Sequence, residues 1–159
     1  MPSENELLIE RFYAAFDRRD GEAMAACYAT DATFSDPVFP DLRGSEPGDM
    51  WRMLTSRAND LRVELRSHEA GDERGSARWI AHYTFTQTGR PVVNDVTASF
   101  RFRDGLIAEH EDRFDFHKWS RQALGTSGLL LGWTPLVRNA VRRRARAGLE
   151  EFQRGERPA

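Results

Sequence analysis

The hydrophobic and polar positions of the first sixty residues predict three helices. Apolar residues begin directly after a capping box at residues 3–6 and recur at intervals of three and four, which indicates a helix over residues 4–18. Asp20 is a suitable N-cap for a second, short helix over residues 22–28. A third apolar stripe follows a loop rich in proline and glycine and predicts a helix over residues 50–59.

The period of the pattern changes to two after residue 60. Leu61, Val63 and Leu65 alternate with charged residues, as in a half-exposed strand. Further strands, separated by turn residues, are expected over residues 77–86, 92–103 and 106–117, and a short strand over residues 33–35 precedes the third helix. The order of helix, helix, strand, helix and four strands indicates an α+β fold with an antiparallel meander.

The segment after the last expected strand is strongly apolar. A glycine-rich link over residues 125–135 leads to an amphipathic helix over residues 135–153, with Pro135 at its first position. The apolar side of this helix must pack on the same domain or on a partner subunit, whereas Leu129, Leu130 and Leu131 in the link could close a cavity as a lid. The sequence thus predicts a domain over residues 1–118, an extension over 119–153 and a disordered tail over 154–159.

Composition and charge limit the class of partner. The formal net charge of -2 and 30% charged residues give no signal for nucleic-acid binding. No apolar run approaches the roughly 18 residues of a membrane span, so no stable membrane insertion is expected. The first residues lack the features of a secretory leader, and the single cysteine, Cys27, is typical of a small buried hydrophobe, which favours the cytoplasm. The seven arginines between residues 138 and 157 are interpreted as the solvated face of the last helix.

One carboxylate stands out in the stretch over residues 32–39. Asp36 follows the short strand and precedes Pro37, whose ring holds the aspartate away from the α conformation. Phe34, Val38 and Phe39 surround it with apolar side chains, and desolvation there would raise its pKa, as a general base requires. An Asp-Pro turn that faces water explains these eight residues equally well.

Three stretches in this order carry a resemblance to a known superfamily. They are residues 11–16 (RFYAAF), residues 28–38 (YATDATFSDPV) and residues 88–102, from the Thr-Gly-Arg turn to Phe-Arg-Phe. Together they resemble the nuclear transport factor 2-like superfamily, which includes ketosteroid isomerase and SnoaL-like polyketide cyclases. The resemblance implies a cone-shaped, curved antiparallel sheet with three N-terminal helices that enclose one cavity, and a homodimer whose convex sheet faces meet at Ile80, His82 and Thr84.

The resemblance also places Asp36 at the position of the base of ketosteroid isomerase. That enzyme uses an oxyanion hole made of a tyrosine and a protonated aspartic acid. The corresponding positions here are Phe12 and Ala98, which offer no hydrogen-bond donor. Tyr13 is one residue away, but one step turns a side chain by about 100° around a helix. Steroid isomerisation by the same groups is therefore not expected.

Strand alternation predicts which side chains line the cavity. With Phe100 facing inward, His110 and Asp112 share the inward face of the last strand and form a possible proton-transfer pair. The expected apolar and polar lining is Phe12, Phe34, Trp51, Trp79, Tyr83, Asn94, Ala98 and Phe114. His110 and Asp112 can equally be a buried pair that only satisfies its own hydrogen bonds. A register shifted by one would turn four charged side chains inward, which is costly.

Other chemistries find weaker support. His110, Asp112 and His117 lack a compact metal-ligand spacing, so no metal is expected. A serine-histidine-aspartate triad lacks the G-x-S-x-G turn. The Asp-Arg-Asp set of epoxide hydrolases in this superfamily would need Arg101 between Asp36 and Asp112, but Arg101 alternates outward.

The predicted function is acid-base chemistry on a small hydrophobic molecule. Asp36, His110 and Asp112 are the candidate catalytic residues of an isomerase or cyclase that uses no cofactor. The alternative is a non-catalytic binding protein with the same cavity, because this fold hosts both. A third hypothesis is a protein-interaction role of the basic C-terminal helix.

Overall fold

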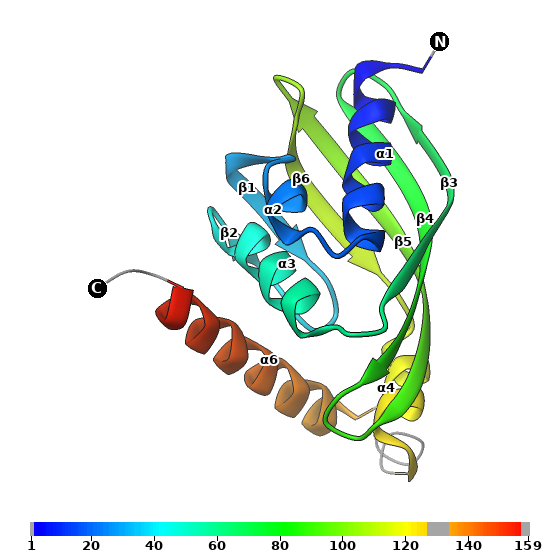
Figure 1. The fold of residues 1–159 in the computed structure, drawn as a ribbon, viewed down its shortest axis with the longest axis vertical. Helices are drawn as coiled ribbons and strands as arrows, with labels where there is room; N and C mark the ends of the chain where they lie inside the picture. Colours follow the sequence, from blue (N-terminus) through cyan, green and yellow to red (C-terminus); the bar gives the residue numbers. More distant parts are fainter. Residues whose placement is uncertain (1, 127–133, 157–159) are drawn as a thin grey trace.

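A computed structural model of the chain describes residues 2–126 and 134–156. It is an α+β fold in which one curved six-stranded sheet has the strand order β2-β1-β6-β5-β4-β3. In chain order the elements are α1 (Glu4–Asp17), α2 (Gly21–Ala25), β1 (Tyr28–Ser35), β2 (Leu42–Arg43), α3 (Glu46–Arg57), β3 (Arg62–Ala70), β4 (Arg74–Phe85), β5 (Arg90–Arg103), β6 (Leu106–Arg113), α4 (Phe116–Leu124) and α6 (Pro135–Glu156) (Figure 1).

The N-terminal helices begin where their caps predict. The Ser3 side chain accepts a hydrogen bond from the Glu6 amide, and the Asp20 side chain accepts one from the Ala23 amide. The predicted end of the second helix was wrong, because α2 stops at Ala25 and Tyr28 opens strand β1 instead. This difference moves the Tyr28 side chain from a helix face onto the sheet.

Helix α3 begins four residues earlier than the sequence pattern indicated. Glu46 is its first residue and Pro47 lies in its first turn, where a missing amide hydrogen costs nothing. Gly48 is inside the helix because α3 lies against α2 here, and a Cβ at Gly48 would stand 2.9 Å from the Ala25 Cβ. The proline and glycine that suggested a loop thus belong to the start of a helix.

Strands β3 to β6 form the predicted antiparallel meander, and β1 joins it by pairing parallel to β6. The prediction of a strand as far as residue 117 was wrong. Strand β6 ends at Arg113, and Asp115 caps helix α4 by accepting a hydrogen bond from the Lys118 amide. Phe116, Trp119 and Ala123 are buried at helical spacing, which is why this segment forms a helix.

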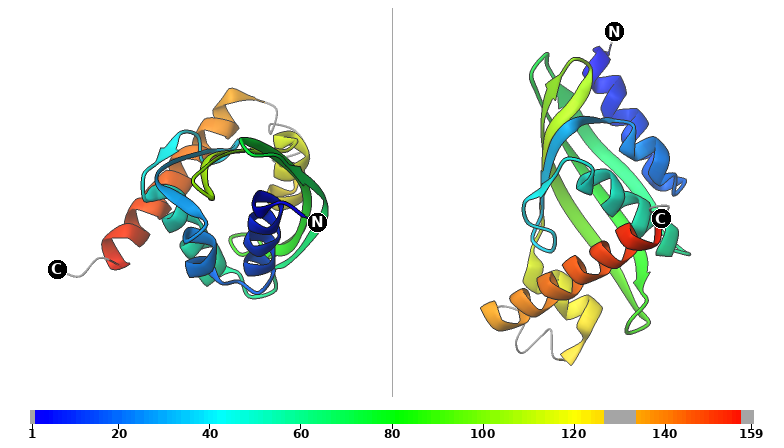
Figure 2. Two further views of the ribbon diagram at one scale, coloured as in Figure 1. Left: turned by 90° about the horizontal axis from the view of Figure 1, so that it is seen from above. Right: turned by 90° about the vertical axis from the view of Figure 1, so that its left-hand side faces the viewer.

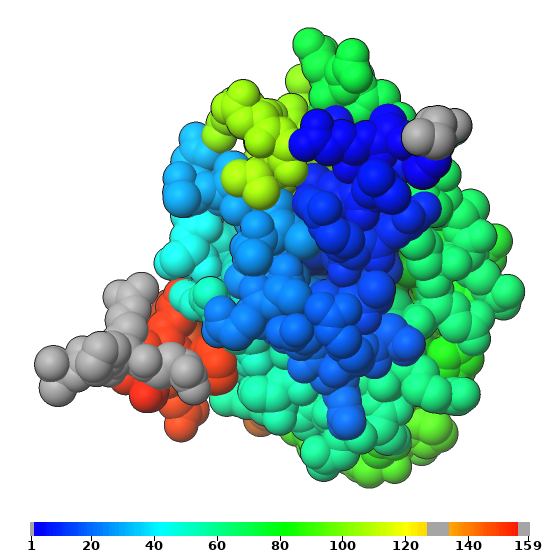
Figure 3. Space-filling model, turned by 45° about the horizontal axis from the view of Figure 1, so that its top comes forward, coloured from blue at the N-terminus to red at the C-terminus, as the bar shows by residue number. Residues whose placement is uncertain are grey.

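The three N-terminal helices cover the concave face of the sheet. Seen from above, the sheet curls around α1 (Figure 2), and the space-filling view shows the N-terminal residues as a continuous surface in front of the strands (Figure 3). Phe12, Ile9 and Phe34 are almost completely buried between these layers. This arrangement is the cone that the sequence predicted.

Helix α6 lies against α3 of the same chain, across the end of the cone where α4 also lies (Figure 2). Leu149 is 0% exposed, and Ala145 and Phe152 pack against the main core. Arg146 forms a 2.7 Å ion pair with Glu46 at the start of α3. Leu129, Leu130 and Leu131, proposed as a lid, lie outside the described residues. None of the helices described is long and apolar enough to cross a membrane.

Candidate functional site

A chain of buried hydrogen bonds runs through the core of the cone. The Trp51 indole N–H of α3 donates to the Tyr28 hydroxyl at 2.8 Å, and this hydroxyl lies 2.7 Å from His110 Nδ1. His110 Nε2 lies 2.8 Å from Asp112 Oδ1. Three elements, α3, β1 and β6, therefore meet at one imidazole.

The direction of these hydrogen bonds follows from what each group can donate. The Asp112 carboxylate accepts from His110 Nε2–H, so Nδ1 of a neutral ring accepts the Tyr28 hydroxyl proton. The Tyr28 oxygen then accepts the Trp51 N–H. Every donor in the chain has an acceptor, which is the arrangement that a buried polar network needs to be stable.

Aromatic rings enclose the imidazole of His110. Its centroid is 4.5 Å from that of Phe100, 4.9 Å from that of Phe34 and 5.7 Å from that of Phe12. The side chain of His110 is 0% exposed and that of Asp112 is 2% exposed. With both ring nitrogens bonded and no access to solvent, His110 can position Asp112 but does not reach a ligand in this conformation. Asp112 Oδ2 has no hydrogen-bond partner among the described residues.

Asp36 lies in a tight turn after β1 and is half-buried. Its Oδ1 accepts two short hydrogen bonds, from the Val38 amide at 2.7 Å and the Phe39 amide at 2.6 Å. Oδ2 has no partner among the residues that the structure describes and is not sealed from solvent. The turn thus fixes the carboxylate through one oxygen and leaves the other available.

The environment of Asp36 raises its pKa to about 7. Desolvation by burial is the main cause, and the nearby negative charge of Asp112 adds to it, while the two amide hydrogen bonds and the Arg142 guanidinium act in the opposite direction. Arg142 also donates a 2.9 Å hydrogen bond from Nε to the Pro37 carbonyl oxygen. A carboxylate with a pKa near neutral pH is suited to both taking up and releasing a proton.

Tyr83 occupies the same end of the concave face as Asp36. It is half-buried, and its hydroxyl accepts a 2.8 Å hydrogen bond from the Trp119 indole N–H of α4. Burial raises the pKa of Tyr83 to about 12, and the negative charge of Asp36 contributes to this shift. The hydroxyl therefore keeps its proton at neutral pH.

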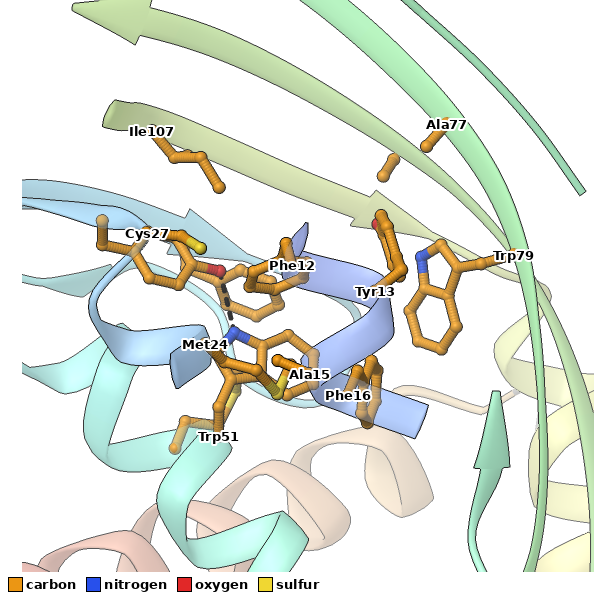
Figure 4. Packing of buried hydrophobic residues seen from close by; sticks show 14 of the residues in the cluster. Phe12, Tyr13, Ala15, Phe16, Met24, Cys27, Trp51, Ala77, Trp79 and Ile107 are labelled. Carbon is orange, nitrogen blue, oxygen red and sulfur yellow. Dashed lines mark hydrogen bonds between the residues drawn. The ribbon is translucent and has the colours of Figure 1, made fainter. Parts of the chain in front are cut away.

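The structure divides the expected lining residues into two groups. Phe12, Phe34, Trp51, Trp79 and Ala98 are buried and pack against one another in the main core, part of which is shown in Figure 4. Tyr83, Asn94 and Phe114 are half-buried, as Asp36 is. Ala98 on β5 is paired with Asp112 on β6. The Asp112 carboxylate therefore lies beside the position that the resemblance to ketosteroid isomerase assigns to a protonated aspartic acid. Asp36, Tyr83, Asn94 and Phe114 are therefore the predicted site residues that are not completely buried.

The outer face of the sheet presents a different surface. An open depression of about 560 Å³ lies there, and its polar walls include Arg101, Glu109, Glu111 and Arg113. Arg101 and Glu109 form a 3.3 Å ion pair, and both are exposed. Arg101 therefore points away from Asp36 and Asp112, as strand alternation indicated.

Two buried donors in the core have no partner within residues 2–126 and 134–156. These are the Tyr13 hydroxyl and the Trp79 indole N–H. Their rings lie 5.8 Å apart between α1 and the sheet (Figure 4). Desolvation raises the pKa of Tyr13 well above its usual value, and the charge of Asp112 contributes to that rise. Leaving such groups unpaired reduces stability.

Three residues of this region were not predicted to take part in the site. Tyr28 was predicted to end a helix, although the threonines that follow it, Thr30 and Thr33, favour a strand. The pairing of β1 with β6 shifts register between Tyr28 and Thr33. This irregularity interrupts the residue alternation from which a strand beginning at Tyr28 could have been predicted. Trp119 was placed in the extension without a predicted element, and Arg142 was placed on a solvated helix face. No local signal places Arg142 beside Pro37, because 105 positions separate the two residues.

Metal ligation has no obvious basis in the part of the chain that the structure covers. Nowhere in it do three or more histidine, cysteine, aspartate or glutamate side chains gather at a distance that could hold an ion. His110 bonds instead to Tyr28 through Nδ1 and to Asp112 through Nε2.

Comparison with known proteins identifies relatives of the fold. Residues 9–110 match the family model of the SnoaL-like domain. Among curated proteins none matches the sequence significantly. Solved structures that resemble this one include an NTF2-like protein of unknown function from Burkholderia pseudomallei, with a TM-score of 0.66, 21% identity, and coverage of 76% of this chain and 97% of that one.

Two further similar structures have names that suggest a chemistry. One is a candidate polyketide cyclase from Xanthomonas campestris pv. campestris, with a TM-score of 0.64 and 25% identity, which covers 75% of this chain and 96% of its own. The other is an LEH-like epoxide hydrolase from M. tuberculosis, with a TM-score of 0.62, 21% identity, and coverage of 84% and 95%. The second likeness extends to the fold alone.

Proposed function

The chain belongs to the SnoaL-like domain family, and from this we propose that it is an acid-base catalyst that acts on a small hydrophobic carbonyl compound, with Asp36 as the base. The observation that carries the proposal is the state of Asp36. One of its oxygens is fixed by two amides, the other has no partner among the described residues, and its pKa is raised to about 7. A desolvated, oriented carboxylate of this kind is suited to removing a proton from carbon.

The proposed reaction moves one proton and needs no cofactor. Asp36 takes the proton from the carbon next to the carbonyl group, and the electrons of the broken C–H bond form the enolate. If the ketone carries a β,γ double bond, the protonated Asp36 returns the proton to the γ-carbon of the dienolate, which moves the double bond. Alternatively, the enolate carbon attacks a second carbonyl and closes a ring, and the alkoxide formed there takes the proton from Asp36. The name of the Xanthomonas structure is consistent with the second outcome.

Asp112 and His110 have supporting parts in this proposal. The charge of Asp112 helps to raise the pKa of Asp36, and its Oδ2 has no hydrogen-bond partner among the described residues. His110 holds Asp112 through Nε2 and is held in turn by Tyr28. We therefore treat His110 as a positioning residue and Asp112 as the second carboxylate of the site.

A binding protein without turnover is the second candidate function. The observation that favours it is the packing of the cone interior, where Phe12, Phe34 and Trp51 contact one another and His110. A ligand would then occupy only the half-buried end near Asp36 and Tyr83.

Deuterium exchange distinguishes the two functions. Cyclic ketones led by 2-tetralone are incubated with the protein in D₂O, and loss of the α-proton signal is followed by NMR. We expect the wild-type rate to rise with pH around an apparent pKa of about 7 and Asp36→Asn to lower it by about 100-fold or more. Asp41→Asn, in an exposed ion pair of the same loop, should exchange like the wild type.

Each outcome assigns the protein to one class. Equal exchange in the wild type and in Asp36→Asn would remove Asp36 as the base. Binding of the ketones, measured by quenching of tryptophan fluorescence, without exchange above the buffer rate would identify the binding function instead. Exchange that is lost in Asp36→Asn and retained in Asp41→Asn supports catalysis.

We also propose that two chains associate through the outer face of the sheet. Ile80 on this face is 9% exposed, with His82 and Thr84 following it along β4 at positions that a partner could contact. The exposed side chains of β5 and β6 carry both signs of charge, including Arg101 and Arg113 and the glutamates that they pair with, so the same surface on a second copy can complement them. Light scattering during size-exclusion chromatography should give twice the chain mass of 18.2 kDa, and a peak at the single-chain mass would contradict the proposal.

A further inference from the structure

The segment after residue 110, where the match to the family model ends, supplies two contacts to the half-buried end of the cone. Helix α4 brings Trp119 to the Tyr83 hydroxyl, and helix α6 brings Arg142 to the Pro37 carbonyl oxygen. One contact holds the Tyr83 hydroxyl, and the other holds the turn that carries Asp36. The extension therefore does more than cover apolar surface.

The Tyr83 hydroxyl retains a donor that the described residues do not use. A tyrosine hydroxyl can donate one hydrogen bond and accept two. Trp119 Nε1 donates to the Tyr83 oxygen at 2.8 Å, which occupies one acceptor position and leaves the O–H proton without an acceptor in the described contacts. Tyr83 is half-buried, so the residue is not completely enclosed by the core.

Tyr83 and the Asp36 loop are neighbours. Val38, two residues after Asp36, and Tyr83 both pack against the cluster formed by Val92, Phe116, Trp119 and Ala123. Tyr83 also lies on the same face of β4 as the buried Trp79 and Ala81, so its ring projects from the concave side of the sheet. The Tyr83 hydroxyl and the Asp36 carboxylate are thus close enough for the negative charge of Asp36 to help raise the pKa of Tyr83.

We propose that Tyr83 is a catalytic residue that donates its hydroxyl proton as a hydrogen bond to the carbonyl oxygen of a ketone whose α-carbon faces Asp36, and that Trp119 is the positioning residue that orients this hydroxyl. This inference rests on the proposed function and names its substrate class: a neutral ketone with an apolar ring system. The apolar part contacts Val38 and Phe114.

The roles of the two groups complement each other as the proton moves. When Asp36 takes the α-proton, the electrons of the C–H bond shift toward the carbonyl oxygen, which becomes negatively charged. The Tyr83 hydroxyl bonds more strongly to this oxygen than to the neutral ketone, so it stabilises the transition state. The raised pKa of Tyr83 keeps the proton on the tyrosine, so that it donates a hydrogen bond without transferring the proton.

The site thus acquires the donor that Phe12 and Ala98 do not provide. Phe12 is buried among Tyr28, Trp51 and His110, and Tyr13 lies beside Trp79. Neither position presents a hydroxyl at the half-buried end of the cone. Tyr83 does so from a different strand and is oriented by a helix outside the matched family region.

Two measurements on 2-tetralone test the inference. In the exchange assay, Tyr83→Phe should lower the rate constant of the bound ketone by about 100-fold with little change in KM, and Trp119→Phe by about 10-fold. In the infrared spectrum of carbonyl-¹³C 2-tetralone bound to Asp36→Asn, the C=O band should lie at lower frequency than in an alkane solvent. Adding Tyr83→Phe to that variant should return the band toward the alkane value.

Tyr13→Phe is the matched control, because it removes a hydroxyl from the same interior at a position away from the half-buried end. It should exchange and shift the carbonyl band like its parent protein. Circular dichroism and thermal unfolding of each variant establish that it is folded, and Trp119→Phe, which leaves the Tyr83 hydroxyl in place, gives an independent test of its orientation.

Failure of this inference is distinguishable from failure of the proposed function. If Tyr83→Phe neither slows exchange nor moves the band while Asp36→Asn stops exchange, Asp36 is the base and Tyr83 has no part. If the band depends on Tyr83 but Asp36→Asn exchanges at the wild-type rate, Tyr83 binds the carbonyl and Asp36 is not the base. An unshifted band in every protein overturns the assignment of Tyr83.

Discussion

Asp36→Asn is expected to be more stable than the wild type by about 2–4 kcal/mol at pH 8, although it loses the proposed base. The folded protein holds the Asp36 proton up to a pH of about 7, whereas the unfolded chain releases it near the ordinary aspartate pKa of 3.8. Asparagine keeps an acceptor oxygen for the Val38 and Phe39 amides and carries no charge to desolvate. The predicted gain is therefore a direct measure of what the raised pKa costs the fold.

The pH dependence has a defined sign. Between pH 4 and pH 7 the folded state binds more protons than the unfolded state, so the free energy of unfolding falls as the pH rises, by at most about 1.4 kcal/mol per pH unit from this group. The advantage of Asp36→Asn should consequently be absent below pH 4, grow through this window and become constant above pH 7 to 8.

Urea unfolding of both proteins at a series of pH values measures this difference. The free energy of unfolding of the wild type is subtracted from that of Asp36→Asn at each pH. This subtraction is needed because hydrogen bonds and ion pairs lower the pKa values of Asp20, Asp60 and Asp95. These three groups make the free energy of unfolding rise with pH, whereas Asp36 makes it fall. Asp41→Asn, which removes an exposed carboxylate from the same loop, is the matched control. A difference curve for Asp36→Asn that is flat from pH 4 to pH 8 would contradict the raised pKa.

Tyr28→Phe should destabilise the protein by about 2–5 kcal/mol, while Tyr13→Phe should leave stability unchanged or raise it by about 1 kcal/mol. Both changes remove one buried hydroxyl. The Tyr28 hydroxyl accepts from Trp51 and bonds His110, so its loss leaves two buried polar groups unpaired. The Tyr13 hydroxyl has no partner among the described residues, so its loss removes an unpaired group.

Equilibrium unfolding in urea compares these two variants under one set of conditions. If the free energy of unfolding falls with urea concentration at the same slope in both variants, both expose the same amount of surface on unfolding. A loss of stability in Tyr13→Phe that equals the loss in Tyr28→Phe would mean that the Tyr13 hydroxyl has a partner in solution, such as a buried water molecule.

Local features of the fold were predictable from the sequence. The caps at Ser3 and Asp20 began helices where expected, and the turns around Gly89 and Gly105 separated the strands of the meander. Residue alternation also placed His110 and Asp112 on the buried face of β6. These features depend on neighbouring residues, whose physical preferences are visible in a single sequence.

The residues that complete the candidate site could not be predicted in the same way. Tyr28 meets His110 only because β1 pairs parallel to β6, which joins strands far apart in the sequence. Trp119 meets Tyr83 only because α4 folds back on β5 after the meander. The amphipathic spacing of α4 was present in the sequence, but alternation continuing from β6 concealed it. Pairing and docking of this kind are set by tertiary packing, not by local propensity.

The hydrogen bond from Arg142 to Pro37 has a consequence for how the protein is made. It joins residues 105 positions apart, and the donor lies on the last helix. During synthesis the cone can pack from its own residues before α6 has left the ribosome, since local and meander contacts close shorter loops. The Asp36 turn receives its cation only after the residues of α6 have been synthesised. Chains that terminate early would therefore carry a folded cone with an unfinished site.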